Sequence, residues 1–328
     1  MSNDSLQAIV YCLKYEAEGV VGVELRPADP AMVFPAFEPG AHIDLKLGNG
    51  LVRSYSLVNL GNGDQRYVIG VLKDRNSRGG SRFVHEQLRV GQVVTVSAPR
   101  NHFKLNEDAH QSVLVAGGIG ITPIYCMLQR LVELGRSVDL IYCARNRASA
   151  AFLADIDALV AKAALSGGKT IGVHYHFDSE QGGPPDLSSL FAARDSDTHF
   201  YCCGPGPMLD AFVDACAGRD EACVHLERFA AGKVGGSTPQ MGYVVELKKS
   251  KKTVLVSPGA SLLDAVLDAG LTPSFSCREG LCGACETRVL EGTVDHRDQI
   301  LTKAERTANN TMMICVSGCS SGTLVLDL

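Results

Sequence analysis

Residues 277–285 read Cys-Arg-Glu-Gly-Leu-Cys-Gly-Ala-Cys, and Cys315 follows after 29 intervening residues. This Cys-x4-Cys-x2-Cys spacing with one distant cysteine is the ligand pattern of a plant-type 2Fe-2S cluster. The small residues between the cysteines let the backbone curl tightly and direct amide N–H groups at the sulfides, which lowers the cost of the cluster's negative charge. The predicted metal ligands are Cys277, Cys282, Cys285 and Cys315.

Two alternatives for these cysteines stay open. A structural zinc site could use the same four thiolates, although zinc sites usually show two paired Cys-x2-Cys knuckles. Cys319 lies four residues after Cys315 and could compete with it as a ligand. The chain has 12 cysteines in total. Most of those outside this region lie in apolar segments, where cysteine packs as a small hydrophobic residue.

The composition predicts a soluble globular protein of two or three domains. The chain has 328 residues, of which 45% are hydrophobic and 20% charged. A net charge of −5 without a long basic run argues against nucleic acid or an anionic membrane as the partner. Residues 1–10 show no secretory signal, so we expect a cytoplasmic protein. The charge-free stretch 111–129 contains glycines and a proline, which favours a strand, turn and helix start over a membrane span.

The first hundred residues predict a small antiparallel barrel. Short strand-like runs alternate with turn signals such as Gly48-Asn49-Gly50 and Gly61-Asn62-Gly63, and such spacing is typical of small barrels. The expected strands are 5–15, 20–26, 42–47, 51–59, 66–73 and 92–98.

From residue 112 onward, strands alternate with helices, which predicts a parallel sheet covered by helices. The expected strands are 113–116, 138–143, 170–177 and 198–203, with helices ending near residue 134 and spanning 151–165 and 186–194. Residues 230–242 have the composition of a linker. We therefore expect three domains, 1–106, 107–232 and 233–328.

Two glycine-rich turns end strands of the expected parallel sheet. The first contains Gly117, Gly118, Gly120, Thr122 and Pro123, and the second contains Cys203, Gly204 and Pro205. Glycines let a backbone approach a pyrophosphate, and a helix N-terminus supplies free N–H groups to it. Glycine turns also occur where a strand and a helix only pack closely, and the spacing is not Gly-x-Gly-x-x-Gly. Together, however, the two turns could frame one dinucleotide crevice at the carboxyl edge of the sheet.

A second group of candidates lies in the expected barrel. In Arg53-Ser54-Tyr55-Ser56, the arginine and the tyrosine point to one face of a strand. The pair could hold a phosphate and stack on a planar cofactor, or it could be an exposed strand with a packed tyrosine. The following loop ends in Gly79, Gly80 and Ser81 and offers a second anion cradle.

The order of these motifs resembles that of the phthalate dioxygenase reductase family over nearly the whole chain. The matching motifs are Arg-x-Tyr-Ser, Gly-Gly-Ser, Gly-Gly-Ile-Gly-Ile-Thr-Pro, Cys-Gly-Pro and the C-terminal cysteine pattern. The resemblance implies the architecture of the ferredoxin-NADP reductase superfamily: an antiparallel β-barrel for flavin, an α/β nucleotide domain and an α+β ferredoxin domain of the β-grasp type. It also implies a reductase component of a Rieske-type dioxygenase or O-demethylase, vanillate demethylase among them.

The resemblance also implies roles for single residues. Flavin contacts would come from Arg53, Ser54, Tyr55 and Ser56, with Ser56 near N5, while Gly79, Gly80 and Ser81 would hold the phosphate. Phe229 would cover the isoalloxazine, and Thr122 and Cys203 would lie near the nicotinamide. The expected catalytic residues are accordingly Ser56, Thr122 and Cys203.

The family implies FMN rather than FAD, although the sequence alone does not separate them. The loop Ala144-Arg145-Asn146-Arg147 could bind a 2′-phosphate, and no acidic residue ends the preceding strand, but the family prefers NADH. We expect hydride transfer from NADH to the flavin, then single-electron transfer to the cluster and to a partner oxygenase. We expect a monomer. The alternatives are a stand-alone flavin reductase and a zinc-stabilised nucleotide-binding regulator.

Overall fold

The computed structural model describes residues 5–61, 63, 65–165, 171–230 and 242–328. The chain divides into two units, Met1–Phe229 and Ala230–Leu328. Some of the expected features lie outside the described residues. They are residues 231–241 of the linker, the boundary between residues 232 and 233, Asn62 of a turn and Thr170 of a strand. The boundaries of the three expected domains stay predictions.

The first part of unit 1 is a closed antiparallel sheet. Its six strands follow the order β4-β3-β6-β1-β2-β5, and an antiparallel bridge from Leu57 to Ile69 joins the two end strands. Alternate side chains, including Val23, Leu25 and Ile43, are fully buried inside it. The elements are β1 (Ser5–Ala17), β2 (Val20–Pro27), β3 (His42–Lys46), β4 (Val52–Ser56), β5 (Tyr67–Leu72), α1 (Gly80–Glu86) and β6 (Val93–Ser97). The expected antiparallel architecture is confirmed.

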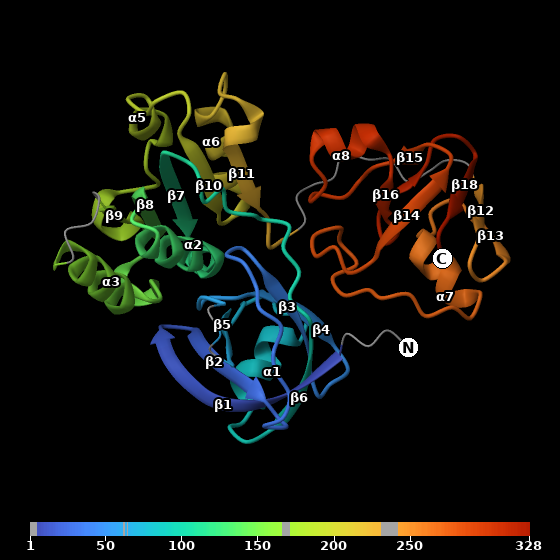
Figure 1. Ribbon diagram of the computed structural model, residues 1–328, viewed down its shortest axis with the longest axis horizontal. Coiled ribbons are helices and arrows are strands. Elements are labelled where there is room, and N and C mark those ends of the chain that lie inside the picture. Colours follow the sequence, from blue (N-terminus) through green and yellow to red (C-terminus); the bar gives the residue numbers. More distant parts are fainter. Residues whose placement is uncertain (1–4, 62, 64, 166–170, 231–241) are drawn as a thin grey trace. The chain divides into compact units, whose positions relative to one another are not determined.

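The rest of unit 1 is a parallel five-stranded sheet in the order β11-β10-β7-β8-β9. Helices α2 and α3 cover one face and α5 and α6 the other, as Figure 1 shows. The strands are β7 (Gln111–Gly117), β8 (Ser137–Ala144), β9 (Ile171–Phe177), β10 (His199–Cys203) and β11 (Val224–Glu227). The helices are α2 (Ile121–Glu133), α3 (Leu153–Leu165), α4 (Asp178–Gln181), α5 (Leu187–Phe191) and α6 (Gly206–Ala215), with short 3-10 turns at Gly118–Gly120, Arg147–Ser149 and Glu221–Cys223.

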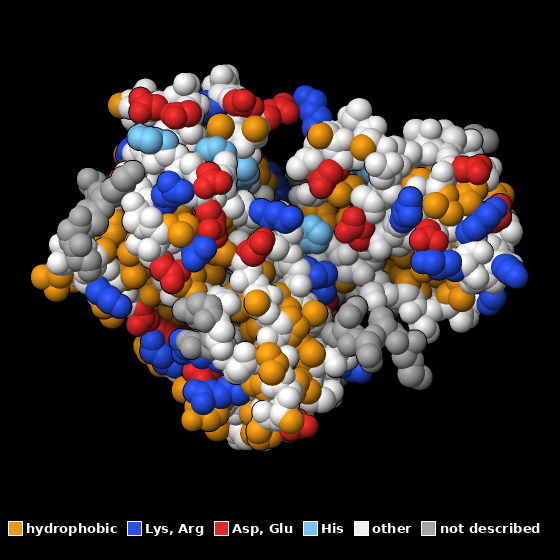
Figure 2. Space-filling view, viewed as in Figure 1, with side chains coloured by type: hydrophobic (Ala, Val, Ile, Leu, Met, Phe, Trp, Pro, Cys, Tyr) orange, Lys and Arg blue, Asp and Glu red, His pale blue; other side chains and the backbone are white. Residues whose placement is uncertain are grey.

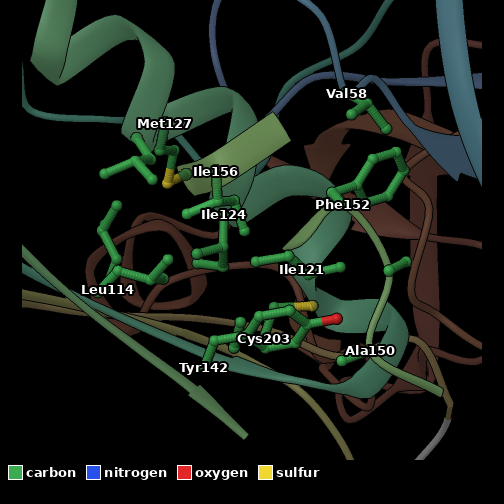
Figure 3. Packing of buried hydrophobic residues seen from close by; sticks show 14 of the residues in the cluster. Val58, Leu114, Ile121, Ile124, Met127, Tyr142, Ala150, Phe152, Ile156 and Cys203 are labelled. Carbon is green, nitrogen blue, oxygen red and sulfur yellow. The ribbon is translucent and has the colours of Figure 1, made fainter. Parts of the chain in front are cut away.

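The barrel and the parallel sheet share one apolar core. Val58 from the barrel belongs to the same buried cluster as Ile121 and Ile124 of α2 and Phe152 at the start of α3 (Figure 3). Phe152 has a left-handed backbone with φ 63°, and its ring stacks on Tyr125 with centroids 5.8 Å apart. A strained backbone of this kind persists only where packing fixes it, so the junction between the two sheets is a well-packed interior.

Unit 2 has a mixed sheet in the order β13-β12-β18-β14-β16, in which β12 and β18 are parallel and the other pairs antiparallel. Helix α7 buries Leu262, Leu263 and Val266 against it. The elements are β12 (Tyr243–Leu247), β13 (Lys252–Val256), α7 (Leu262–Asp268), β14 (Glu286–Glu291), β15 (Val294–Asp295), α8 (Lys303–Ala308), β16 (Thr311–Met313), β17 (Gly318–Cys319) and β18 (Thr323–Leu326). The expected α+β fold is confirmed.

In the part of the chain that the structure describes, every helix is too short or too polar to span a bilayer. On the face of the molecule shown in Figure 2, acidic and basic side chains are interspersed.

Candidate functional site

The four predicted cluster ligands lie in one region of unit 2. Cys277, Cys282 and Cys285 occupy the loop between α7 and β14, and Cys315 follows β16. The loop curls between Cys277 and Cys285 because three residues there have a left-handed backbone: Arg278 at φ 58°, Gly280 at φ 68° and Gly283 at φ 69°. At Gly280 a side chain is also excluded by space, since a Cβ would lie 2.7 Å from Val316 and 2.9 Å from the Cα of Asp298.

Backbone amides of this loop point at the cysteine sulfurs. The N–H groups of Glu279 and Leu281 donate to Cys277 Sγ, with N–S distances of 3.3 and 3.4 Å, and the N–H of Cys277 donates to Cys282 Sγ at 3.5 Å. Amides in this arrangement stabilise negative charge on sulfur. The loop is therefore suited to thiolates and to a bound group that is itself negative.

The four thiols also contact one another in pairs. A hydrogen bond with Cys282 lowers the pKa of Cys277, and one with Cys315 lowers that of Cys285. Hydrogen bonding to Cys277 raises the pKa of both Cys282 and Cys315. These mutual effects are those expected of sulfurs that lie near one another, as the ligands of one group must.

The spacing of the cysteines favours a cluster over a single metal ion. Three close cysteines and one distant cysteine lack the two paired Cys-x2-Cys knuckles that are usual in a structural zinc site. In a 2Fe-2S cluster the four cysteines are divided between two irons. Cys319 lies on β17 with its Sγ 3.5 Å from Ser321 Oγ. The donor set fits the cluster better than it fits zinc.

A second site lies where the barrel meets the parallel sheet in unit 1. Ser56, the last residue of β4, donates a hydrogen bond to Glu227 Oε2 across 3.4 Å. Glu227 ends β11 and is the register partner of Cys203, which ends β10. The structure thus brings two of the three expected catalytic residues, Ser56 and Cys203, beside one carboxyl group.

The ionisation of this site follows from its burial. Burial raises the pKa of Glu227 to about 8, against the opposing effect of the Ser56 hydrogen bond. Burial, and after it the charge of Glu227, also raises the pKa of the Cys203 thiol well above its ordinary value. At neutral pH this region therefore contains a protonated carboxyl and a thiol, and Cys203 is not a thiolate nucleophile.

The third expected catalytic residue, Thr122, is buried in the same junction. Its hydroxyl donates to the carbonyl of Ile119 at 3.0 Å, and its methyl group would lie 2.8 Å from a Cβ at Gly70 of β5. Gly120, two residues earlier, touches the carbonyl of Cys203, since a Cβ there would be 2.1 Å from that oxygen. Thr122 thus lies between β5 and the end of β10.

Most of the glycines in the two turns serve close packing. A Cβ at Gly117 would meet Met208 Sδ and Pro205 Cδ at 2.6 Å, and one at Gly204 would meet Met208 Sδ at 2.8 Å. Gly118, with φ 54°, and Gly206, the first residue of α6, face open space, with no atom within 4 Å of a Cβ. Pro123 lies in the first turn of α2 and is buried. Most of these glycines therefore allow a strand and a helix to pack closely, and both turns lie at the carboxyl edge of the sheet.

The flavin candidates of the barrel fall into two groups. Arg53 donates to the carbonyls of Val52 at 2.8 Å and Arg78 at 3.1 Å, and its side chain covers Gly80, where a Cβ would lie 2.7 Å from Arg53 Cγ. Tyr55 lies on the same face of β4, and burial raises its pKa to about 12. Arg53 thus lies against the Gly79-Gly80 turn. Gly79 in this turn has a left-handed backbone with φ 90°.

Ser54 and Ser81 are engaged in other contacts. Ser54 points to the opposite face and donates to Asp44 Oδ1 at 2.6 Å, and Asp44 also pairs with Arg100 at 2.7 Å. Ser81 Oγ donates to Ser77 Oγ at 3.0 Å and accepts from the N–H of Asp74 at 3.1 Å. Phe229 follows Glu227 by two residues and is 43% exposed.

Glu227 is the residue of this site that the sequence did not single out. An acidic residue at the carboxyl end of the last parallel strand was the available signal. The contact with Ser56 could not be predicted, because the two residues are 171 positions apart in the chain.

Comparison with protein families divides the chain in the same way. Residues 114–214 match the family described as oxidoreductase NAD-binding domain. Residues 245–320 match the family described as 2Fe-2S iron-sulfur cluster binding domain. The chain is therefore an oxidoreductase with a nucleotide-binding and an iron–sulfur domain.

Full-length relatives are similar to the chain over nearly all of its residues. The phenoxybenzoate dioxygenase subunit beta of Ectopseudomonas oleovorans is 44% identical over 97% of this chain and 96% of its own length. The tetrachlorobenzoquinone reductase of Sphingobium chlorophenolicum is 44% identical over 95% of this chain and 94% of its own length. The vanillate O-demethylase oxidoreductase of a Pseudomonas strain (HR199) is 39% identical over 98% of this chain and 100% of its own length.

A solved structure has the same architecture. Phthalate dioxygenase reductase, described as a modular structure for electron transfer from pyridine nucleotides to 2Fe-2S, is 34% identical and has a TM-score of 0.69. The match covers 99% of this chain and 98% of that protein.

Proposed function

This chain belongs to the phthalate dioxygenase reductase family, and from that premise we propose that it passes electrons from NADH through FMN to a 2Fe-2S cluster and on to a partner oxygenase. The partner would be a Rieske-type aromatic-ring dioxygenase or O-demethylase, in keeping with the names of the relatives. We further propose that the protein acts as a cytoplasmic monomer of three domains, 1–106, 107–232 and 233–328.

The observation that carries the proposal is the cysteine loop of unit 2 on the same chain as a nucleotide-binding sheet. Its paired thiols and inward-facing amides are suited to a one-electron carrier. A nicotinamide, in contrast, donates two electrons at once. When bound, a flavin accepts the hydride and releases the electrons one at a time.

In this proposal the residues of the barrel hold and orient the flavin. Arg53 lies beside the Gly79-Gly80 turn and would exchange its bonds to backbone carbonyls for the flavin phosphate. The N–H of Gly79 donates to Ser77 Oγ at 3.2 Å and would exchange that bond for the phosphate. Tyr55, on the same face as Arg53, would pack against the ring system, and Phe229 would cover its other face.

Ser56 and Glu227 would hold a proton beside the reacting atoms. Glu227 is protonated at neutral pH, and its contact with Ser56 gives a route from the carboxyl to the hydroxyl. A hydride that reached a bound flavin would leave negative charge on it, and a neighbouring group that holds a proton at neutral pH could offset that charge. Thr122 and Cys203 would shape the nicotinamide position without chemical participation, because both are buried and Cys203 stays a thiol.

The test begins with the absorption spectrum of the purified protein. We expect bands of both flavin and iron–sulfur cluster. Zinc in a colourless protein would refute the proposal.

The variant Cys282→Ser then tests the order of the carriers. We expect it to abolish NADH-dependent reduction of cytochrome c and to leave NADH-driven bleaching of the flavin largely intact. The matched control is Cys319→Ser, which removes the neighbouring cysteine outside the predicted ligand set and retains both activities. Undiminished cytochrome c reduction in Cys282→Ser would show that the order is wrong.

A second candidate function is direct reduction of a quinone, which the tetrachlorobenzoquinone reductase among the relatives favours. In that case the electrons could leave from the flavin. Quinone reduction that survives in Cys282→Ser would support this function, whereas loss of quinone and cytochrome c reduction together would support the route through the cluster.

A further inference from the structure

The loop after β8 contains two arginines, and the first turn after β9 contains two carboxylates. Arg145 and Arg147 follow β8, and Asp178 and Glu180 lie in α4. Arg147 Nε lies 3.8 Å from Glu180 Oε1, with 62% of the arginine and 49% of the glutamate side chain exposed. The guanidinium of Arg147 also lies over the ring of Phe177, 4.6 Å from its centroid.

Local hydrogen bonds fix both segments. Asn146 caps the 3-10 turn by accepting from the N–H of Ser149 at 2.9 Å. The N–H of Ser179 donates to the carbonyl of Arg145 at 2.9 Å, which joins α4 to the loop after β8. Gln181 accepts from the N–H of Phe177 at 2.7 Å. The Arg147–Glu180 pair is therefore held by two anchored turns.

The position of this pair in the sheet bears on nucleotide choice. β8 is the direct parallel neighbour of β7, which ends in the first glycine turn. In parallel dinucleotide-binding sheets, the residues after the strand next to the phosphate turn face the adenosine ribose, where an acid favours the 2′-hydroxyl and an arginine accommodates a 2′-phosphate. The strand ends at Ala144 and Arg145 follows it, so the sequence shows no acid at this point. The structure supplies one from α4.

We propose that Glu180 makes this chain prefer NADH to NADPH by occupying Arg147 and by placing a carboxylate where the 2′-phosphate would bind. This inference rests on the proposed function. A 2′-phosphate would have to displace Glu180 from Arg147 and would be repelled by it. The 2′-hydroxyl of NADH is neutral and can donate a hydrogen bond to a carboxylate.

Removing the charge of Glu180 should free Arg147 for the phosphate. Within the described part of the chain, the exposed side chain of Arg145 makes no hydrogen bond or ion pair, so it provides a second cation for the same group. Glu180→Gln should therefore raise the ratio of kcat/KM for NADPH to that for NADH about tenfold. Arg147→Gln combined with Glu180→Gln should remove most of this gain, because the cation that Glu180 held is then absent and only Arg145 remains.

The experiment uses the holoenzyme with ferricyanide as acceptor, and it measures both nucleotides for each variant. Isothermal titration with NAD+ and NADP+ supplies a readout that is independent of turnover. The matched control is Glu133→Gln, since Glu133 forms a similar exposed pair with Arg130 at 3.0 Å at the end of α2. The control should leave the ratio unchanged.

The expected result is a tenfold change in the NADPH to NADH ratio in Glu180→Gln, matched by tighter binding of NADP+. An unchanged ratio, or a gain that is undiminished in the double variant, would overturn the inference and leave the proposed function standing. Failure of the wild-type holoenzyme to react with either nucleotide would overturn the proposed function and the inference together.

Discussion

At the scale of single residues, Glu227 has the most informative environment. Because its pKa is raised to about 8, the carboxyl is protonated at neutral pH and ionises in the mildly alkaline range. If the proton held between Glu227 and Ser56 is used during turnover, NADH-dependent activity should decline as the pH rises through about 8.

Glu227→Gln should remove that alkaline inflection and lower kcat by about 10²-fold, the ordinary size of a general acid–base contribution. Ser56→Ala breaks the same contact from the other side and should reduce kcat similarly. The measurement is kcat from pH 6 to 10 at saturating NADH. Persistence of the inflection in Glu227→Gln would assign it to another group.

Gly120 offers a prediction about packing. Gly120→Ala places a Cβ 2.1 Å from the carbonyl of Cys203, a contact that no small adjustment relieves, because both partners are backbone. We expect a loss of at least about 1–3 kcal/mol of stability, as for other overpacked interiors. Gly206→Ala is the control, since a Cβ there meets nothing within 4 Å. Thermal unfolding of the two variants compares them, and equal melting temperatures would contradict the packing account.

At the scale of elements, β10 and β11 contain a pair of histidines away from the candidate site. His199 Nδ1 lies 3.1 Å from His225 Nε2, and the ring of His225 stacks on Tyr201 with centroids 4.4 Å apart. Burial and then the neighbouring His199 lower the pKa of His225 to about 4. The folded chain therefore keeps His225 neutral at pH values where the unfolded chain protonates it.

Acid should therefore destabilise the folded chain through His225. Between pH 6.5 and 4 the unfolded state binds the additional proton, so the free energy of unfolding falls as the pH falls, by about 3 kcal/mol over that interval. His225→Gln should flatten this acid dependence. The measurement is the melting temperature of unit 1 at pH 7 and pH 5, and equal acid sensitivity in the variant and the wild type would refute the assignment.

The elements also show what the sequence could predict. Alternation of strands and helices predicted the parallel sheet, because each β–α unit is a local pattern. The helix expected at 186–194 is shorter, spanning Leu187–Phe191, since Asp186 caps its start while the chain turns at Arg194 to pair with Asp139. The cysteine motif predicted its own loop, since spacing and glycines are local. The Ser56–Glu227 and Arg147–Glu180 contacts depend on tertiary structure and had no local signature.

At the scale of the whole molecule, the two units have separate cores. Two apolar clusters of unit 1 fill the parallel sheet's faces and a third fills the barrel, while the cluster of unit 2 includes Cys285 and Cys315. Ligand binding to one unit should therefore stabilise that unit alone.

We expect calorimetry of the holoprotein to resolve two unfolding transitions. Destroying the iron–sulfur cluster with an oxidant and a chelator should lower only the transition of unit 2, and adding NAD+ should raise only that of unit 1. The cluster absorbance and the flavin fluorescence assign the two transitions. A single cooperative transition that shifts with both treatments would show that the units unfold together.

The Ser56–Glu227 contact also has a consequence for biosynthesis. The two residues are separated by 171 positions, and Glu227 lies at the end of β11, at the edge of its sheet. At ordinary translation rates, a ribosome needs roughly 10–30 s to travel between the two codons. During that interval the nascent barrel has its serine but lacks the carboxyl that completes the site. A flavin captured co-translationally would thus occupy an unfinished site, and electron transfer could begin only after the last strand of unit 1 has left the exit tunnel.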